Sequence, residues 1–559
     1  MRFLKPETLS VILFAGAIEI SLFEILNVSI NNYDLLRYPF GLTQELPPVF
    51  WIGDFLCAFA IIIPILQYQK FDKKLYNKIV PASLVFLIFN SFFLFYFINP
   101  VFVLARDELG HSSEVFLLLA RHSTLMNPGL YQAYYPFGFI YGAISFLFSP
   151  LSPTTYFIFY GPFIFPLIQL ITGYAFLRLF LKSPFSELGF LVMIIASMPF
   201  YVAEWSPQLM SYNLLMPAFL LIGLIIKNGG SRLLPLLVVI TGLTGLTDIG
   251  TFGSSVTALI GMIAFYRKIG NFNWKYVGYS SLLTASIYIY WVFFNPLAQG
   301  AQGGADLLLG RLVTLLESIF IPEATKNLVL PSSHLASTFI PSSPYHFYSV
   351  ISKLIDGGIF LASGIASFIL LLKSRKTNKF LWMAFAVGLS LIAMQSALGL
   401  ANNISNVLTR MIPQAMVFFT VIIIVYLQQK KLLFKIAPFF LILLIPLAIL
   451  GYAMIATSEH SPEAAFMGGE LLGRYGVSSD PTYEFYVTVY CYEGHEIPTQ
   501  GKISGVNFGG PYIETLSIYF NGPNLSGYDT YYNGIIENDT VFFNSGEMLA
   551  GTLLINFNK

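Results

Sequence analysis

The chain has 559 residues, of which 56% are hydrophobic and only 11% are charged. Soluble globular domains carry about a quarter charged residues, so this composition excludes a soluble globule and indicates a polytopic membrane protein. The formal net charge of +1 gives no reason to expect nucleic-acid binding.

Apolar runs long enough to cross a hydrocarbon layer of about 30 Å recur along the chain. The first run has no small-residue cleavage site, so we interpret it as an uncleaved span and not as a signal peptide. We predict a mainly α protein with about thirteen transmembrane helices, near residues 9–30, 51–67, 79–104, 154–181, 187–203, 208–226, 232–247, 250–266, 275–294, 348–372, 379–400, 410–428 and 433–456.

The basic residues predict the orientation of these spans. Most Lys and Arg residues fall in short connections on one side, and all six His residues fall on the other. Because cytoplasmic loops are enriched in Lys and Arg, we expect a cytoplasmic N-terminus and, with an odd number of spans, an exterior C-terminus. Two cysteines and a compact tail favour an integral, multi-pass protein of a prokaryotic cell membrane, archaeal membranes included.

The first exterior loop, 101–153, carries the most informative polar residues. Asp107 and His111 are four residues apart, so in a helix both side chains lie on one face. The stretch 136–152 is too short for a span and is bracketed by prolines. A full span there would also place Arg178 and Lys182 outside, against the charge rule. We therefore expect a half-inserted or interfacial helix that forms a wall of the site.

Other acidic and basic residues fall at the same predicted ends of spans. Glu204 and Asp248 lie in exterior connections, and Arg410 lies at the exterior end of a span. Acidic and imidazole groups gathered there would bind a divalent cation or act as a general base towards a hydroxyl. A guanidinium forms bidentate bonds to phosphate oxygens, so this face suits a lipid-phosphate donor whose tail stays in the bilayer.

We expect three regions. Residues 1–78 hold two N-terminal spans, and 79–456 form a catalytic membrane module with a long exterior loop at 295–347. A loop of that length is typical of a lid or binding loop. From about residue 457, Gly, Asn, Ser and Tyr rise and the strand-like run 483–492 appears, which predicts a small exterior β-rich domain over 457–559.

At these residues the chain resembles the GT-C superfamily of membrane glycosyltransferases, which use sugars linked to polyprenyl or dolichyl phosphate. The resemblance covers roughly 79–456 in span order, and oligosaccharyltransferase-like and mannosyltransferase-like members are its nearest types. It rests on an Asp just after a span, the Asp-x-x-x-His pattern at 107–111, Tyr134-Tyr135-Pro136, and Glu204 two spans later.

The resemblance implies roles for Asp107, Glu204 and Arg410, to which we add further candidates. Asp107 would be the catalytic acidic residue, as base or metal ligand, and His111 and Glu204 would support it or a Mn²⁺ or Mg²⁺ ion. Arg410 would hold the donor phosphate. Substrate-binding candidates are Tyr134, Tyr135, Asp248 and His346.

The chain also departs from the family pattern. Glu204 stands alone where paired acids are usual, and no Trp follows Trp382, so the tail lacks a WWDYG-type peptide-recognition motif. The acceptor remains open among a glycan, a lipid and a protein. Two other interpretations remain: a lipid or solute transporter with a broken helix at 136–152, and a non-catalytic subunit of a membrane complex.

Overall fold

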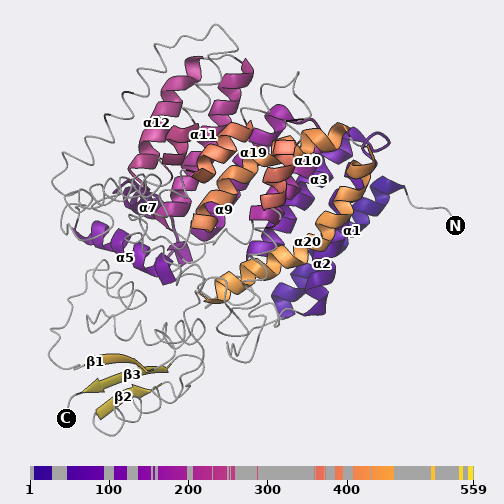
Figure 1. The fold of residues 1–559 in the computed structure, drawn as a ribbon. Helices are drawn as coiled ribbons and strands as arrows, with labels where there is room; N and C mark the ends of the chain where they lie inside the picture. Colours follow the sequence, from indigo (N-terminus) through magenta and orange to yellow (C-terminus); the bar gives the residue numbers. More distant parts are fainter. Residues whose placement is uncertain are drawn as a thin grey trace, which may run out of the picture.

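The structure is a computed structural model, and Figure 1 shows its fold as a bundle of helices with a small sheet near the C-terminus. It describes residues 5–27, 47–93, 106–121, 136–152, 155–157, 161–197, 206–228, 231–248, 251, 253–258, 282, 286, 358, 360–369, 372, 384–393, 407–429, 431–458, 505–509, 540–544 and 552–557.

Three N-terminal helices pack together: α1 (Pro6–Asn27), α2 (Pro48–Leu66) and α3 (Lys73–Ile88), which continues as the π-helix η2 (Phe89–Phe93). Their sequences are apolar enough to bury most of α2 and one face of α3. A buried hydrogen-bond chain joins all three segments, since Ser21 donates to Asn90 at 2.6 Å and Asn90 donates to Asp54 at 2.7 Å.

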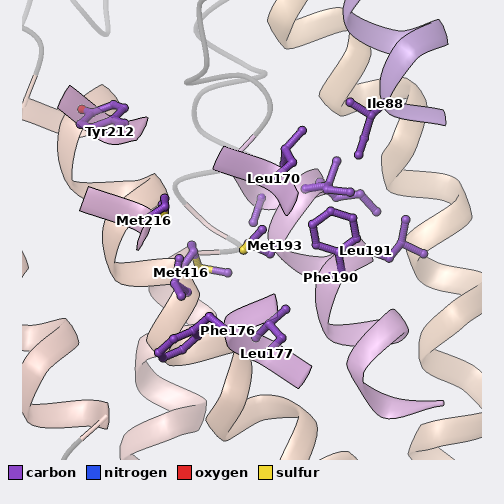
Figure 2. Close-up of a cluster of buried hydrophobic side chains, with 14 of the residues drawn as sticks. Ile88, Leu170, Phe176, Leu177, Phe190, Leu191, Met193, Tyr212, Met216 and Met416 are labelled. Atoms are coloured by element: carbon purple, nitrogen blue, oxygen red, sulfur yellow. The ribbon is translucent and has the colours of Figure 1, made fainter. Parts of the chain in front are cut away.

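Beside described helical stretches at 253–258, 360–369 and 384–393, six further helices build most of the remaining bundle. They are α9 (Gly161–Phe180), α10 (Phe185–Ser197), α11 (Pro207–Asn228), α12 (Leu234–Gly245, preceded by the 3₁₀ turn η5, Ser231–Leu233), α19 (Val407–Gln429) and α20 (Lys431–Ser458). Figure 2 shows the buried side chains between them, where Phe176, Met193, Met216 and Met416 come from four different helices.

Contacts between the ends of helices define one end of this bundle, and the opposite end follows from it. The amine of Lys227 at the end of α11 donates to the carbonyl of Leu179 at the end of α9, at 2.9 Å. The rings of Phe185 and Phe434 lie 4.8 Å apart and join the starts of α10 and α20. We call this the inner end, after the predicted orientation. The outer end carries the end of α12 and the starts of α11 and α19.

Two short helices lie at the outer end: α5 (Arg106–Arg121) and α7 (Pro136–Leu147). A helix of 12 residues is about 18 Å long, too short for a hydrocarbon layer of about 30 Å. The structure shows a short helix within 136–152, as predicted, while its half-inserted or interfacial position stays a prediction. In Figure 1, α7 lies between α5 and the lower end of α12.

The membrane prediction is borne out in its coarser form. Among the described residues, three helices are long and apolar enough to cross a membrane, namely Pro6–Phe23, Pro48–Leu66 and Pro207–Ile225, and eight shorter helices are also apolar. The total of thirteen spans stays a prediction, because the span expected at 275–294 lies almost wholly outside the described residues. Helices α10 and α12, of 13 and 12 residues, are shorter than the spans predicted there.

Three strands are described in the C-terminal region: β1 (Gly505–Gly509), β2 (Thr540–Asn544) and β3 (Thr552–Phe557). They pair antiparallel in the order β1-β3-β2, with a register shift between Val541 and Phe543. The strand predicted at 483–492 lies outside the described residues. The exterior domain over 457–559 remains a prediction, as does its position outside the membrane.

Candidate active site

Helix α5 carries the Asp-x-x-x-His pattern. The stretch is helical from Arg106, so the condition for a shared face is met, and Asp107 and His111 occupy positions on one helix face. The described side chains of α5 begin with His111, whose partly buried ring lies 6.0 Å from the ring of Phe139 in α7. A second pair lies further along both helices: the ring centres of Phe116, in α5, and Phe146, in α7, are 5.2 Å apart. The two helices therefore run side by side in the same direction.

The first turn of α7 joins this pair to the main bundle. The amide of Phe137 donates to the carbonyl of Leu246, just past the end of α12, at 3.1 Å. A Cβ atom added to Gly138 would lie 3.5 Å from Pro207, the first residue of α11, and 3.6 Å from Thr247. The starts of α7 and α11 and the end of α12 therefore meet at one place.

Asp248 follows α12 and is 3% exposed. Its Oδ2 accepts the backbone amide of Thr251 at 2.7 Å and the hydroxyl of the same residue at 2.8 Å. This is the geometry of a helix N-cap, and helical residues continue over 253–258. Ser211 of α11 donates to the Thr251 hydroxyl at 2.6 Å, which ties the cap to a second helix.

Helix α19 reaches the same segment through Gln414. The hydroxyl of Ser254 donates to Oε1 of Gln414 at 2.5 Å, and the two residues are 0% and 1% exposed. Arg410 lies four residues before Gln414 in α19, one helical turn nearer the outer end. The start of α19 is therefore joined to the segment that Asp248 caps.

The predicted site residues fall into three groups. The structure describes the side chains of His111 and Asp248, and it gives the helix positions of Asp107 and Arg410, all at the outer end. The remaining predicted residues lie outside the described part of the chain: Tyr134, Tyr135, Glu204 and His346.

The described side chains hold no group of three or more His, Cys, Asp and Glu residues that suits a metal ion. The predicted ligand set needs Asp107 and Glu204, whose side chains are not among those described. His111 is the one predicted ligand whose side chain can be followed, and its ring faces Phe139. A Mn²⁺ or Mg²⁺ site on these residues therefore remains a proposal.

Sequence reasoning missed Ser211, Thr251, Ser254 and Gln414. Each is a buried polar residue within or beside an apolar run. Polar side chains inside membrane-spanning segments are costly, and this cost is the signal by which they stand out. What the sequence does not give is their pairing, since Ser254 and Gln414 are 160 residues apart.

A second buried polar cluster lies at the inner end, around Glu187 in the first turn of α10. Its Oε1 accepts bonds from the Arg178 guanidinium at 2.9 Å, the Tyr174 hydroxyl at 2.9 Å and the Ser183 hydroxyl at 2.8 Å. Its Oε2 accepts from Ser186 at 2.9 Å. Burial raises the pKa of the nearby Tyr76 hydroxyl, and the charge of Glu187 raises it further, so Tyr76 stays neutral.

Comparisons with known proteins give only distant similarities. No family model matches the chain, and no curated protein matches it. Among solved structures, it is similar to an oligosaccharyltransferase from Archaeoglobus fulgidus, crystallised with Zn and sulfate, at a TM-score of 0.41 and 14% identity. That match covers 71% of this chain and 54% of the oligosaccharyltransferase, so the chain spans about half the length of that protein.

A second similar structure is ArnT from Cupriavidus metallidurans in the apo state, at a TM-score of 0.39 and 11% identity, covering 85% of this chain and 97% of ArnT. The first of the two is an oligosaccharyltransferase, a type that the sequence resemblance also names. At these TM-scores and identities, neither similarity carries an argument about this chain, and its function is inferred from its own residues.

Proposed function

We propose that this chain is a GT-C-like membrane glycosyltransferase that moves a sugar from a polyprenyl-phosphate donor to an acceptor at the outer end. One observation carries the proposal. Asp107 lies at the start of α5, and Arg410 lies at the start of α19. A series of contacts through α7, the end of α12 and the segment capped by Asp248 joins these two helices at one end of the bundle. An acid and a phosphate-binding cation at one end are what this transfer requires.

Asp107 is the proposed catalytic acidic residue. A hydroxyl acceptor loses its proton as its oxygen attacks the sugar, and a positioned carboxylate is a suitable base. Asp107 would take that proton directly, or it would bind a divalent cation that orients the acceptor. His111, one turn along α5, and Glu204 would support Asp107 or complete the ligand set.

Arg410 is the proposed phosphate residue. The acceptor oxygen bonds to the anomeric carbon while the bond from that carbon to the phosphate oxygen breaks, and polyprenyl phosphate leaves with the electron pair. A single displacement of this kind inverts the anomeric centre. A guanidinium stabilises the charge that develops on the leaving phosphate through paired hydrogen bonds.

The other proposed contacts complete the site. Tyr134, Tyr135, Asp248 and His346 would bind the donor sugar or the acceptor, and the acceptor is a glycan, a lipid or a protein. We place the reaction on the exterior face of a prokaryotic cell membrane, with the N-terminus in the cytoplasm and the domain over 457–559 outside.

A transfer assay tests the proposal. Purified protein in lipid nanodiscs is incubated with radiolabelled polyprenyl-phosphate sugars, first as prepared, then with EDTA, and then with Mn²⁺ restored. We expect label to move from the lipid to an acceptor or to water. Loss of transfer in EDTA and its return with Mn²⁺ would favour a metal site over a general base, and insensitivity to EDTA would favour the general base.

Two results would contradict the proposal. The first is the absence of any covalent product with every donor sugar and acceptor class supplied. The second is flux of intact labelled substrate across vesicles that contain the protein, which would favour a transporter.

A further inference from the structure

We propose that the side-chain amide of Gln414 is a second donor to the phosphate of the lipid substrate, beside Arg410. This inference rests on the proposed function, because it concerns the same phosphate. It adds a residue that neither the charge pattern nor the family resemblance points to.

The geometry of the amide carries the inference. Ser254 donates to Oε1 of Gln414 at 2.5 Å, which fixes the acceptor side of the amide and leaves Nε2 as its donor side. Nε2 is buried and finds no hydrogen-bond partner among the described residues. Of the twelve buried side-chain atoms without a partner among the described residues, Nε2 of Gln414 is the one nitrogen. Leaving a buried N–H donor without an acceptor costs free energy, and an oxygen of a bound substrate would satisfy it.

The position of Gln414 indicates which acceptor this is. It lies one turn further into the bundle than Arg410 on the same helix, about 6 Å along the axis. A phosphate presents several oxygens to two neighbouring donors, and an amide N–H adds direction to the charge that arginine supplies. The amide is 1% exposed, so the phosphate reaches it only when the side chains above it move aside.

The same contacts link Gln414 to the acidic side of the site. Ser254 belongs to the helical residues that Asp248 caps, and the cap is tied to α11 through Thr251 and Ser211. The segment that holds the amide in place is therefore the segment that begins at Asp248.

Substitution of one atom tests the inference. Gln414→Glu keeps an oxygen for Ser254 and replaces the donor nitrogen with a second oxygen, which repels phosphate. Binding is measured in nanodiscs with undecaprenyl phosphate and with undecaprenol, which has the same chain without the phosphate. We expect Gln414→Glu to weaken binding of the phosphate about tenfold or more and to leave binding of the alcohol unchanged.

Two further variants control for folding. Gln414→Met removes the donor without burying a charge, and we expect it to weaken phosphate binding about fivefold. Gln169→Met makes the same change at a glutamine of α9 that is equally buried, 1% exposed, and whose Nε2 already donates to the carbonyl of Leu209 at 3.1 Å. We expect this control to bind undecaprenyl phosphate as the wild type does.

The inference is overturned if both Gln414 variants bind undecaprenyl phosphate like the wild type, or if they lose the phosphate and the alcohol equally. The first result would mean that an internal water satisfies the amide, and the second that Gln414 only supports the fold. If the wild type binds undecaprenyl phosphate but transfers no sugar, the proposed function is wrong, and the binding measurements still test Gln414. If the wild type transfers sugar and the Gln414 variants bind undecaprenyl phosphate as it does, this inference alone is wrong.

Discussion

Glu187 at the inner end and Gln414 at the outer end are equally buried, at 1% exposed, and their surroundings differ. Glu187 accepts four hydrogen bonds from side chains of α9, α10 and the turn between them. Gln414 receives one bond from Ser254, and its Nε2 has no partner within the described part of the chain. Among the described residues, both oxygens of Glu187 accept side-chain bonds, although the hydroxyl of nearby Tyr76, like the Gln414 nitrogen, is buried without a partner.

This difference separates a structural cluster from a binding site. A buried carboxylate is stable only when its acceptors are filled, and at the inner end the protein itself fills them. At the outer end, one set of bonds joins Ser211, Thr251 and Asp248. Another joins Ser254 to Gln414, whose Nε2 has no partner among the described residues and which lies one turn from Arg410 on α19. We therefore expect changes at the inner end to affect stability and changes at the outer end to affect transfer.

The largest expected effect is that of Asp107→Asn. The amide keeps the size of the carboxylate and removes both its charge and its basicity, so we expect sugar transfer to fall about 1,000-fold. The measurement is transfer per mole of folded protein, with the folded amount determined by size-exclusion chromatography in detergent. Transfer near the wild-type rate would remove Asp107 from the mechanism.

The next effect belongs to the inner end and concerns stability. Glu187→Ala removes the acceptor of Tyr174, Ser183 and Ser186 and one of the two acceptors of Arg178, which keeps its bond to the Ser183 hydroxyl. Because Arg178 is 45% exposed and retains water, we expect a loss of about 2 kcal/mol and not the larger cost of a fully buried pair. Thermal unfolding in detergent measures it, and transfer per folded molecule should be unchanged.

Glu187→Gln is the matched control, since it keeps one acceptor oxygen for the same neighbours. We expect it to recover part of the lost stability. A Glu187→Gln protein that is stable and yet inactive would show that the inner end takes part in the reaction, against the proposed division of roles.

A smaller effect is expected at His111. His111→Phe keeps an aromatic ring against Phe139 and removes both nitrogens. Groups that orient a catalytic residue or metal ligand are typically worth about tenfold in activity, and we expect that loss with normal thermal stability. An equal loss of stability and transfer would instead mean that His111 serves mainly to pack α5 on α7.

The smallest effect separates two roles of Asp248. Asp248→Asn retains the N-cap, because Asn caps helices as well as Asp, so stability should hardly change. Asp248→Ala should cost about 1 kcal/mol of stability. If Asp248 also binds substrate through its charge, the Asn variant loses transfer several-fold. Full transfer by the Asn variant would leave Asp248 with the cap alone.

Much of the helical framework follows from the sequence, because long apolar runs in a membrane have few alternatives to a helix. The predicted spans 51–67 and 208–226 agree closely with α2 and α11. The short helix before Pro150 was also predictable, from proline placement and from the charge rule, whereas the shared face of Asp107 and His111 was conditional on a helix that the structure supplies.

The polar contacts of the site were not predictable in the same way. The bond from Ser254 to Gln414 joins residues from distant helices, and only the packing of α19 against the 253–258 segment brings them together. The charge of Asp248 suggests a ligand, whereas its contacts with Thr251 are those of a helix cap. Hydrophobic periodicity gives the position of a helix along the chain but does not give its neighbours.

The most direct test of the central claim, that the outer end is the donor site, is photolabelling. A polyprenyl phosphate with a photoreactive group beside the phosphate is bound to the wild-type protein and irradiated, and the labelled peptides are identified by mass spectrometry. We predict label in peptides from the starts of α5 and α19, with excess unlabelled polyprenyl phosphate suppressing it. Label confined to the inner end, around residues 178–187 and the start of α20, would contradict the account.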